Sequence, residues 1–133
     1  MIALDTNALL WLDQGDARLR PRVRELADAA LADGELWVSA ISFCEVAALV
    51  VFGSLTLRLP TARWRRELLD RGLLERSIDG AVAIRAVELS DFHKDPGDRL
   101  IVATALVLGA TLVTSDRKIL DWPGPLDRID ARR

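Results

Sequence analysis

Short apolar runs alternate with longer segments of helical periodicity along the whole chain. The short runs predict strands at residues 1–5, 36–40, 73–78, 111–114 and 128–130, and the longer segments predict helices at 7–13, 21–33, 42–52, 61–71, 79–89 and 96–109. Strands separated by helices of this length pair through right-handed crossovers and form parallel sheets with helices on both faces. We therefore expect an α/β fold, a three-layer α/β/α sandwich with a central, mostly parallel sheet, formed by residues 1–133 as a single domain.

The composition fits an ordinary globular domain. Of the 133 residues, 50% are hydrophobic and 29% are charged, and a chain of this length buries a core without disulfides. The longest uncharged stretches, 46–57 and 100–115, are shorter than the ~20 apolar residues that cross a bilayer. The N-terminus lacks a basic leader, so we expect no signal peptide and a cytoplasmic protein.

The charge and the cysteine content exclude several classes of site. The net charge of −2 argues against a protein that coats nucleic acid through a global positive field, so any such contact is expected to be local or metal-assisted. Cys44 is the only cysteine, which excludes an internal disulfide and a cysteine-based zinc cluster. Cys44 lies in an apolar segment, so we expect a buried, structural thiol rather than a nucleophile paired with His93.

Four acids lie where the predicted sheet places its ligand-binding edge. Asp5 closes the first strand in "LDTN", Glu45 lies one turn into the helix after the second strand, and Asp116 follows a later strand in "TSD". Asp98 instead lies in the first turn of a helix, in "FHKDPGDR". Because ligands bind beyond the carboxyl ends of parallel strands, we expect the four side chains to meet there.

Each acid also has a local explanation that needs no function. Asp5 suits a turn or an N-cap, and Glu45 stands three residues after Ser42, as in an S-x-x-E capping box. Asp95 suits the N-cap of the helix that carries Asp98, where acids favour the helix dipole. These explanations are independent of one another and do not predict that four acids converge.

Convergence of four carboxylates requires compensating positive charge. Two carboxylates about 4 Å apart repel by roughly 4 kcal/mol at an effective dielectric constant near 20. Hard divalent cations prefer such oxygen ligands, and Mg²⁺ keeps coordination positions for water and phosphate oxygens. The four acids therefore predict a metal-dependent chemistry on phosphate.

Four segments together resemble the PIN domain family, and more narrowly its VapC-like ribonuclease toxins of type II toxin–antitoxin systems. They are "MIALDTNALLWL", "LWVSAISFCEVAAL", "FHKDPGDRLIVATAL" and "ATLVTSDRKIL", in the family's order over nearly the whole chain. The resemblance implies a Mg²⁺- or Mn²⁺-dependent endoribonuclease that uses a metal-activated water and leaves a 5′-phosphate and a 3′-hydroxyl. It also implies a homodimer and a cognate VapB-like antitoxin that holds the toxin inactive. The residues that match the family's metal-binding and catalytic acids are Asp5, Glu45, Asp98 and Asp116, and those that match its pocket-supporting polar positions are Asn7 and Thr114.

A basic and aromatic segment, "TARWRREL", supplies candidate contacts outside the acids. Arg63, Trp64 and Arg66 are candidate contacts for RNA or for a partner, and so is Arg99, which follows Asp98. The alternative for "TARWRREL" is a solvated basic face with one half-buried ring. The alternative for Arg99 is a surface ion pair.

Two other functions are compatible with the sequence. A receiver-like phosphoacceptor domain also carries Mg²⁺-binding acids at strand ends, but it needs two adjacent early acids, and here Thr6 follows Asp5. Asp79 is a weak candidate for its phosphoacceptor, and Lys118 lies near the position of its late lysine. The second class is a catalytically idle metal-binding protein kept for a partner, which an activity assay distinguishes from a nuclease.

Overall fold

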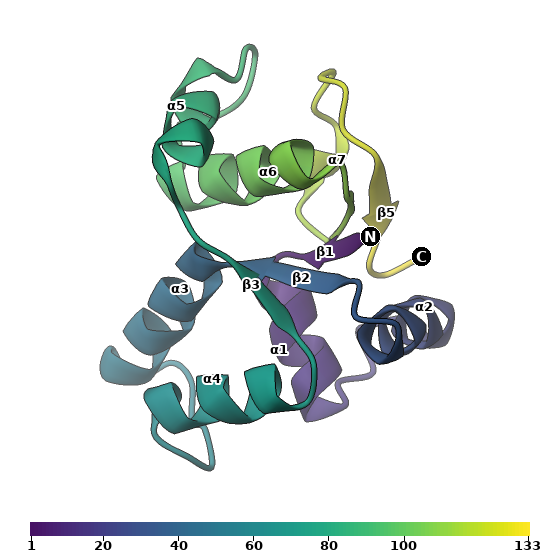
Figure 1. Ribbon diagram of the computed structural model, residues 1–133, viewed down its shortest axis with the longest axis vertical. Helices are drawn as coiled ribbons and strands as arrows, with labels where there is room; N and C mark the ends of the chain where they lie inside the picture. The colour runs from purple at the N-terminus through teal and green to yellow at the C-terminus, as the bar shows by residue number, and fades with distance from the viewer.

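A computed structural model describes all residues 1–133. The chain forms one five-stranded sheet, which Figure 1 shows between two layers of helices. The strands are β1 (Ile2–Leu4), β2 (Leu36–Ser39), β3 (Leu74–Arg76), β4 (Thr111–Thr114) and β5 (Arg128–Asp130). Their order in the sheet is β3-β2-β1-β4-β5, and every neighbouring pair is parallel. The predicted α/β class and the predicted parallel sheet are confirmed.

Seven helices connect and follow these strands. They are α1 (Thr6–Gln14), α2 (Pro21–Ala32), α3 (Ala40–Val51), α4 (Thr61–Asp70), α5 (Gly80–Glu88), α6 (Pro96–Leu108) and α7 (Arg117–Leu120). Six were predicted within two residues of their observed bounds. Helix α7 was not predicted because a single helical turn is too short to show periodicity. None of the helices combines the length and the apolar composition needed to cross a membrane.

The two faces of the sheet bury different helices because successive side chains along a strand point to opposite sides. Leu4, Val38 and Val113 pack into a core formed with α1, α2 and α4. Ala3 and Leu112 pack into a second core formed with α6 and α7. Figure 1 shows α5, α6 and α7 on one side of the sheet and α1, α2 and α4 on the other. This is the expected three-layer sandwich.

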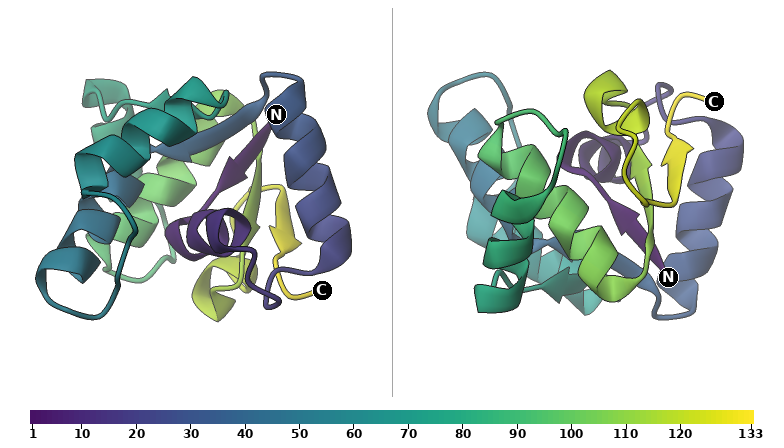
Figure 2. Two further views of the ribbon diagram at one scale, coloured as in Figure 1. Left: turned by 90° about the horizontal axis from the view of Figure 1, so that it is seen from below. Right: turned by 90° about the horizontal axis from the view of Figure 1, so that it is seen from above.

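Edge contacts complete the sandwich. Figure 2 shows α2 beside β5, and the backbone N–H of Arg20, which precedes α2, donates to the carbonyl of Ala131 over 3.0 Å. On the opposite face of the sheet from α2, α5 packs on α6 through Val82, Ala86 and Ala103. The α5–α6 pair therefore forms the outer part of one helical layer.

The structure corrects two expectations about α3. Ser39, not Ser42, is its N-cap and accepts a hydrogen bond from the N–H of Ile41, so the capping box proposed for Ser42 and Glu45 is wrong. Cys44 is exposed, and the expectation of a buried thiol is wrong as well. The buried face of α3 carries Phe43 and Val46, and the helical repeat turns Cys44 away from it.

The direction of α6 explains how Asp98 reaches the ligand-binding edge although no strand precedes its helix. Residue Gly109 ends α6 with a left-handed φ of 65°, and the chain turns directly into β4. A helix that leads back into a parallel strand starts at the carboxyl edge of the sheet. Asp95 caps α6 by accepting from the N–H groups of Gly97 and Asp98, as predicted.

Candidate metal centre

The four predicted acids lie around one pocket. The pocket has a volume of about 330 Å³ and opens beyond the carboxyl ends of β1 and β4. Its polar lining consists of Asp5, Thr6, Asn7, Glu45, Asp98 and Asp116. The structure therefore brings together five of the six residues predicted for the metal site and its supporting shell, and the sixth, Thr114, lies buried directly behind them.

Asp5 is the most buried of the acids. Its side chain is the N-cap of α1 and accepts from the N–H of Ala8 over 2.8 Å. The hydroxyl of Thr114 donates to the other carboxylate oxygen and accepts from the N–H of Asp116 over 3.0 Å. Burial raises the pKa of Asp5 to about 6, against the lowering effect of the hydrogen bonds from Thr114 and Ala8. Thr114 thus links two of the four acids.

Glu45 is held by Thr6, with Ser42 behind it, in roles that were not predicted from the sequence. Thr6 donates a hydrogen bond to its carboxylate, and the Thr6 hydroxyl lies 3.0 Å from that of Ser42. A Cβ atom on Gly97 would lie only 2.6 Å from Glu45 Oε2, so the missing side chain at that position makes room for the carboxylate. The signals for these roles were present, since Thr6 follows Asp5 and Ser42 precedes Glu45 by one helical turn.

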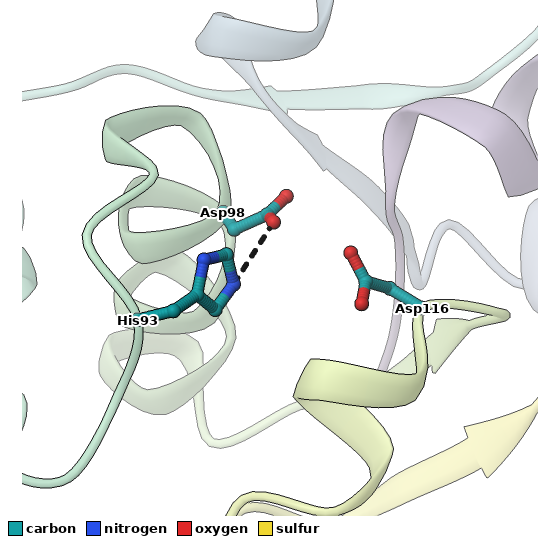
Figure 3. Close-up of side chains that lie close together, drawn as sticks. All are labelled: His93, Asp98 and Asp116. Atoms are coloured by element: carbon teal, nitrogen blue, oxygen red, sulfur yellow. Dashed lines mark ion pairs between the residues drawn. The ribbon is translucent and has the colours of Figure 1, made fainter.

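Asp98 and Asp116 face each other across the pocket (Figure 3). Burial raises the pKa of Asp98 to about 7, and the charges of Asp95 and Asp116 and a side-chain hydrogen bond with Asp116 add to that rise. Asp116 is also the N-cap of α7 and accepts from the N–H of Lys118 over 2.8 Å. The Asp98 carboxylate therefore favours either a proton or a cation beside it.

His93 lies beside Asp98 and Asp116, a position that was not predicted from the sequence. It precedes α6, and one ligand atom from each of His93, Asp98 and Asp116 lies within 4.8 Å of the other two. Its Nε2 is 3.1 Å from Asp98 Oδ2. Its position as the only histidine, five residues before Asp98, was the available signal.

The donor set fits a divalent cation. None of the four acids forms an ion pair with a lysine or an arginine, and the only ion pair to any of them is the one between His93 and Asp98. Carboxylate oxygens without a cationic partner are the ligands that Mg²⁺ and Mn²⁺ favour. Asp5, Glu45, Asp98 and Asp116 are thus suited to hold such an ion.

The candidate RNA or partner contacts lie in different surroundings. Trp64 is 6% exposed, donates to Asp13 over 2.9 Å and packs edge-on against Phe43, so its ring is part of the core. Arg63 and Arg66 are exposed on α4. Arg99 donates to five backbone carbonyl groups rather than forming the alternative surface ion pair.

Comparisons with known proteins agree with the family resemblance of the four sequence segments. The family model described as "PIN domain" matches residues 2–124. The chain is 35% identical to "Ribonuclease VapC22" of Mycobacterium tuberculosis over 119 residues, which cover 89% of this chain and 88% of the relative.

Solved structures share the fold. A toxin–antitoxin complex from Klebsiella pneumoniae contains a chain with a TM-score of 0.69 and 22% identity, covering 98% of each chain. A DNA-bound VapBC from Salmonella typhimurium contains one with a TM-score of 0.68 and 21% identity, covering 97% of this chain and 96% of the other. A receiver domain has the strand order 2-1-3-4-5, whereas the order here is β3-β2-β1-β4-β5, so the receiver alternative is wrong.

Proposed function

This chain belongs to the PIN domain family, and we propose that it is a metal-dependent endoribonuclease toxin whose activity a cognate VapB-like antitoxin holds in check. The observation that carries the proposal is the pocket in which Asp5, Glu45, Asp98 and Asp116 meet without a lysine or arginine partner. The relative that is 35% identical is named a ribonuclease, which supports RNA as the substrate. The proposed place of action is the cytoplasm.

The residues of the pocket take distinct roles in this proposal. The four acids hold one or more Mg²⁺ or Mn²⁺ ions and do not attack the substrate. When bound, such an ion lowers the pKa of a water molecule and offsets the negative charge that develops on a phosphodiester. Thr114 fixes Asp5, and Thr6 fixes Glu45. Asn7 is exposed at the pocket's lining, where its amide can orient an incoming phosphate or ribose.

Further contacts with the proposed partners involve residues outside the lining of the pocket. Arg63 and Arg66, which are exposed on α4, remain candidate contacts for RNA or for the antitoxin. A homodimer is proposed as well, and Ile84 and Val87, which are 62% and 78% exposed on α5, support it as apolar side chains available for an interface. Light scattering of the isolated protein and of the protein co-expressed with the antitoxin measures both assemblies.

The experiment that tests the function is cleavage of a mixed, fluorescently labelled RNA pool by purified protein in EDTA, Mg²⁺ or Mn²⁺. Cleavage is expected only with a metal and is expected to disappear in Asp5→Asn and in Asp98→Asn. The matched control is Asp121→Asn. This substitution removes a carboxylate that is 68% exposed and lies outside the pocket, so the variant should cleave RNA as wild type does. A folded wild-type protein that binds the metal and cuts no RNA would instead favour the catalytically idle alternative.

A further inference from the structure

His93 places an unpaired nitrogen against the acids of the pocket. Nε2 is buried and has no hydrogen-bond partner within the protein, although it lies 3.1 Å from Asp98 Oδ2. That distance suits a hydrogen bond, but the present orientation of the two groups does not form one. A buried donor that loses its water without gaining a hydrogen bond is destabilising, so the position of this nitrogen requires an explanation.

The other ring nitrogen determines where the imidazole carries its proton. The backbone N–H of Asp95 lies 3.4 Å from Nδ1 and donates to it. A nitrogen that accepts a hydrogen bond carries no proton, so the neutral ring carries its proton on Nε2. His93 therefore presents an N–H group, and not a lone pair, to Asp98.

The segment that carries His93 is tied firmly to α6. Arg99 donates from Nε to the carbonyl of His93 over 2.8 Å and from Nη2 to the carbonyl of Phe92 over 2.7 Å. The Phe92 and His93 rings lie with their centroids 4.5 Å apart, and Phe92 is buried against Trp122. Because its backbone is bonded to Arg99 and its ring packs on Phe92, the His93 imidazole is held in place and can fix the Asp98 side chain beside it.

We propose that His93 is a positioning residue whose Nε2–H group holds the Asp98 carboxylate in the orientation that binds the metal. Figure 3 shows the imidazole beside Asp98, with Asp116 facing the two of them. In that orientation Oδ2, which lies 3.1 Å from Nε2, would accept the hydrogen bond, and Oδ1 would remain for the cation. The inference rests on the proposed function because it requires a metal at Asp98.

Direct ligation by His93 is the competing role, and the hydrogen bond at Nδ1 disfavours it. A histidine that binds a metal through one nitrogen almost always donates its other N–H to a carboxylate, a carbonyl or water. Here Nδ1 faces the N–H of Asp95, which is a donor. Ligation through Nε2 would move the proton to Nδ1 and set two N–H groups against each other.

Two variants separate positioning from packing. His93→Ala removes both the ring and the donor, and His93→Gln keeps an amide N–H that reaches the place of Nε2. We expect His93→Ala to weaken Mn²⁺ binding about 10- to 100-fold, as loss of an outer-shell partner does, and His93→Gln to bind within a few-fold of wild type. Free Mn²⁺ measured by electron paramagnetic resonance gives the affinities, and circular dichroism of each variant gives its melting temperature. Unchanged Mn²⁺ affinity in His93→Ala, or an equal loss in both variants, overturns the proposal.

The single histidine allows a direct spectroscopic test. Long-range ¹⁵N–¹H correlation spectra of wild-type protein report which nitrogen carries the proton, and we expect Nε2 both in EDTA and at saturating Mg²⁺. A proton that moves to Nδ1 when Mg²⁺ is added would show that His93 is itself a ligand and would overturn the positioning role. If the folded wild-type protein binds neither Mn²⁺ nor Mg²⁺, the proposed function and this inference both fail. If it binds metal and cuts RNA while the His93 results are negative, only this inference fails.

Discussion

Replacing Asp5 by asparagine is expected to stabilise the metal-free protein at high pH while removing its metal binding. Asparagine caps a helix about as well as aspartate, so α1 keeps the hydrogen bond that the Ala8 N–H donates to residue 5. The substitution removes a carboxylate that is 7% exposed and whose pKa burial raises to about 6 from 3.8. Wild-type protein must ionise this group at neutral pH without a compensating cation, and the variant does not.

The sign and the size of the stability change follow from the difference between the pKa of Asp5 in the folded state and in the unfolded state. The folded state binds the proton of Asp5 more tightly, so the free energy of unfolding falls as pH rises from about 4 to about 6 and then stays level. A rise of about two pKa units corresponds to about 3 kcal/mol, of which about 1 kcal/mol has already been lost by pH 4.5. The advantage of Asp5→Asn over wild type should therefore grow by about 2 kcal/mol between pH 4.5 and pH 8.

Urea unfolding in EDTA, followed by the fluorescence of the four tryptophans, measures this difference at both pH values. Comparing the two pH values cancels constant effects, such as the altered hydrogen bond with Thr114. Asp121→Asn serves as the control and should differ from wild type by less than about 0.5 kcal/mol at each pH. Added Mn²⁺ at 100 times its dissociation constant should stabilise wild type by about 2.7 kcal/mol and leave Asp5→Asn unchanged. An advantage that does not grow with pH would refute the claim that Asp5 is an uncompensated buried charge.

Three further substitutions test how the pocket is built. Gly97→Ala places a Cβ 2.6 Å from Glu45 Oε2, and the flexible carboxylate can move away from it. We therefore expect an unchanged melting temperature by calorimetry, and about tenfold weaker Mn²⁺ binding by titration because Glu45 is displaced. Thr114→Val removes the hydroxyl bonded to Asp5 and should lower the free energy of unfolding by about 1–3 kcal/mol, which urea unfolding measures. Arg99→Lys cannot reproduce five hydrogen bonds to carbonyls and should destabilise by more than about 2 kcal/mol. Normal melting of Arg99→Lys together with weaker RNA binding would mean that Arg99 contacts the substrate instead.

The fold was largely predictable because its signals are local and repeated. Parallel strands buried on both faces read as short apolar runs, and the helices between them show their periodicity over ten or more residues. What escaped prediction depends on tertiary contacts. The start of α3 at Ala40 and its cap at Ser39 could not be told from a start at Ser42, since both serines suit an N-cap. The exposure of Cys44 depends on which face of α3 meets the sheet.

The site was predictable in its acids and less so in their supports. The four acids follow from strand ends, from one helix start and from the resemblance to the PIN domain family. Thr6 contacts Glu45, which is distant in sequence, and His93 lies next to Asp98. Their nearness to predicted acids in the sequence was a signal, but it did not show which acid each side chain meets, because that depends on the tertiary fold. Trp64 and Arg99 carried surface signals in the sequence, yet Trp64 lies in the core and the Arg99 guanidinium is bonded to backbone carbonyls of the same chain.

The local and the functional explanations of the acids hold together. Asp5 and Asp116 are N-caps of α1 and α7, and Asp95 caps the helix that carries Asp98. In a parallel α/β fold the helices that follow strands begin at the carboxyl edge of the sheet, so capping alone gathers acids there. A helix dipole stabilises one exposed acid by about 0.3–1 kcal/mol, whereas two carboxylates about 4 Å apart repel by roughly 4 kcal/mol. Capping can therefore explain Asp5 and Asp116 singly, but it does not explain Glu45 or Asp98, which cap no helix. It also cannot stabilise all four acids in ionised form within one pocket, and a divalent cation would neutralise the negative charge that remains.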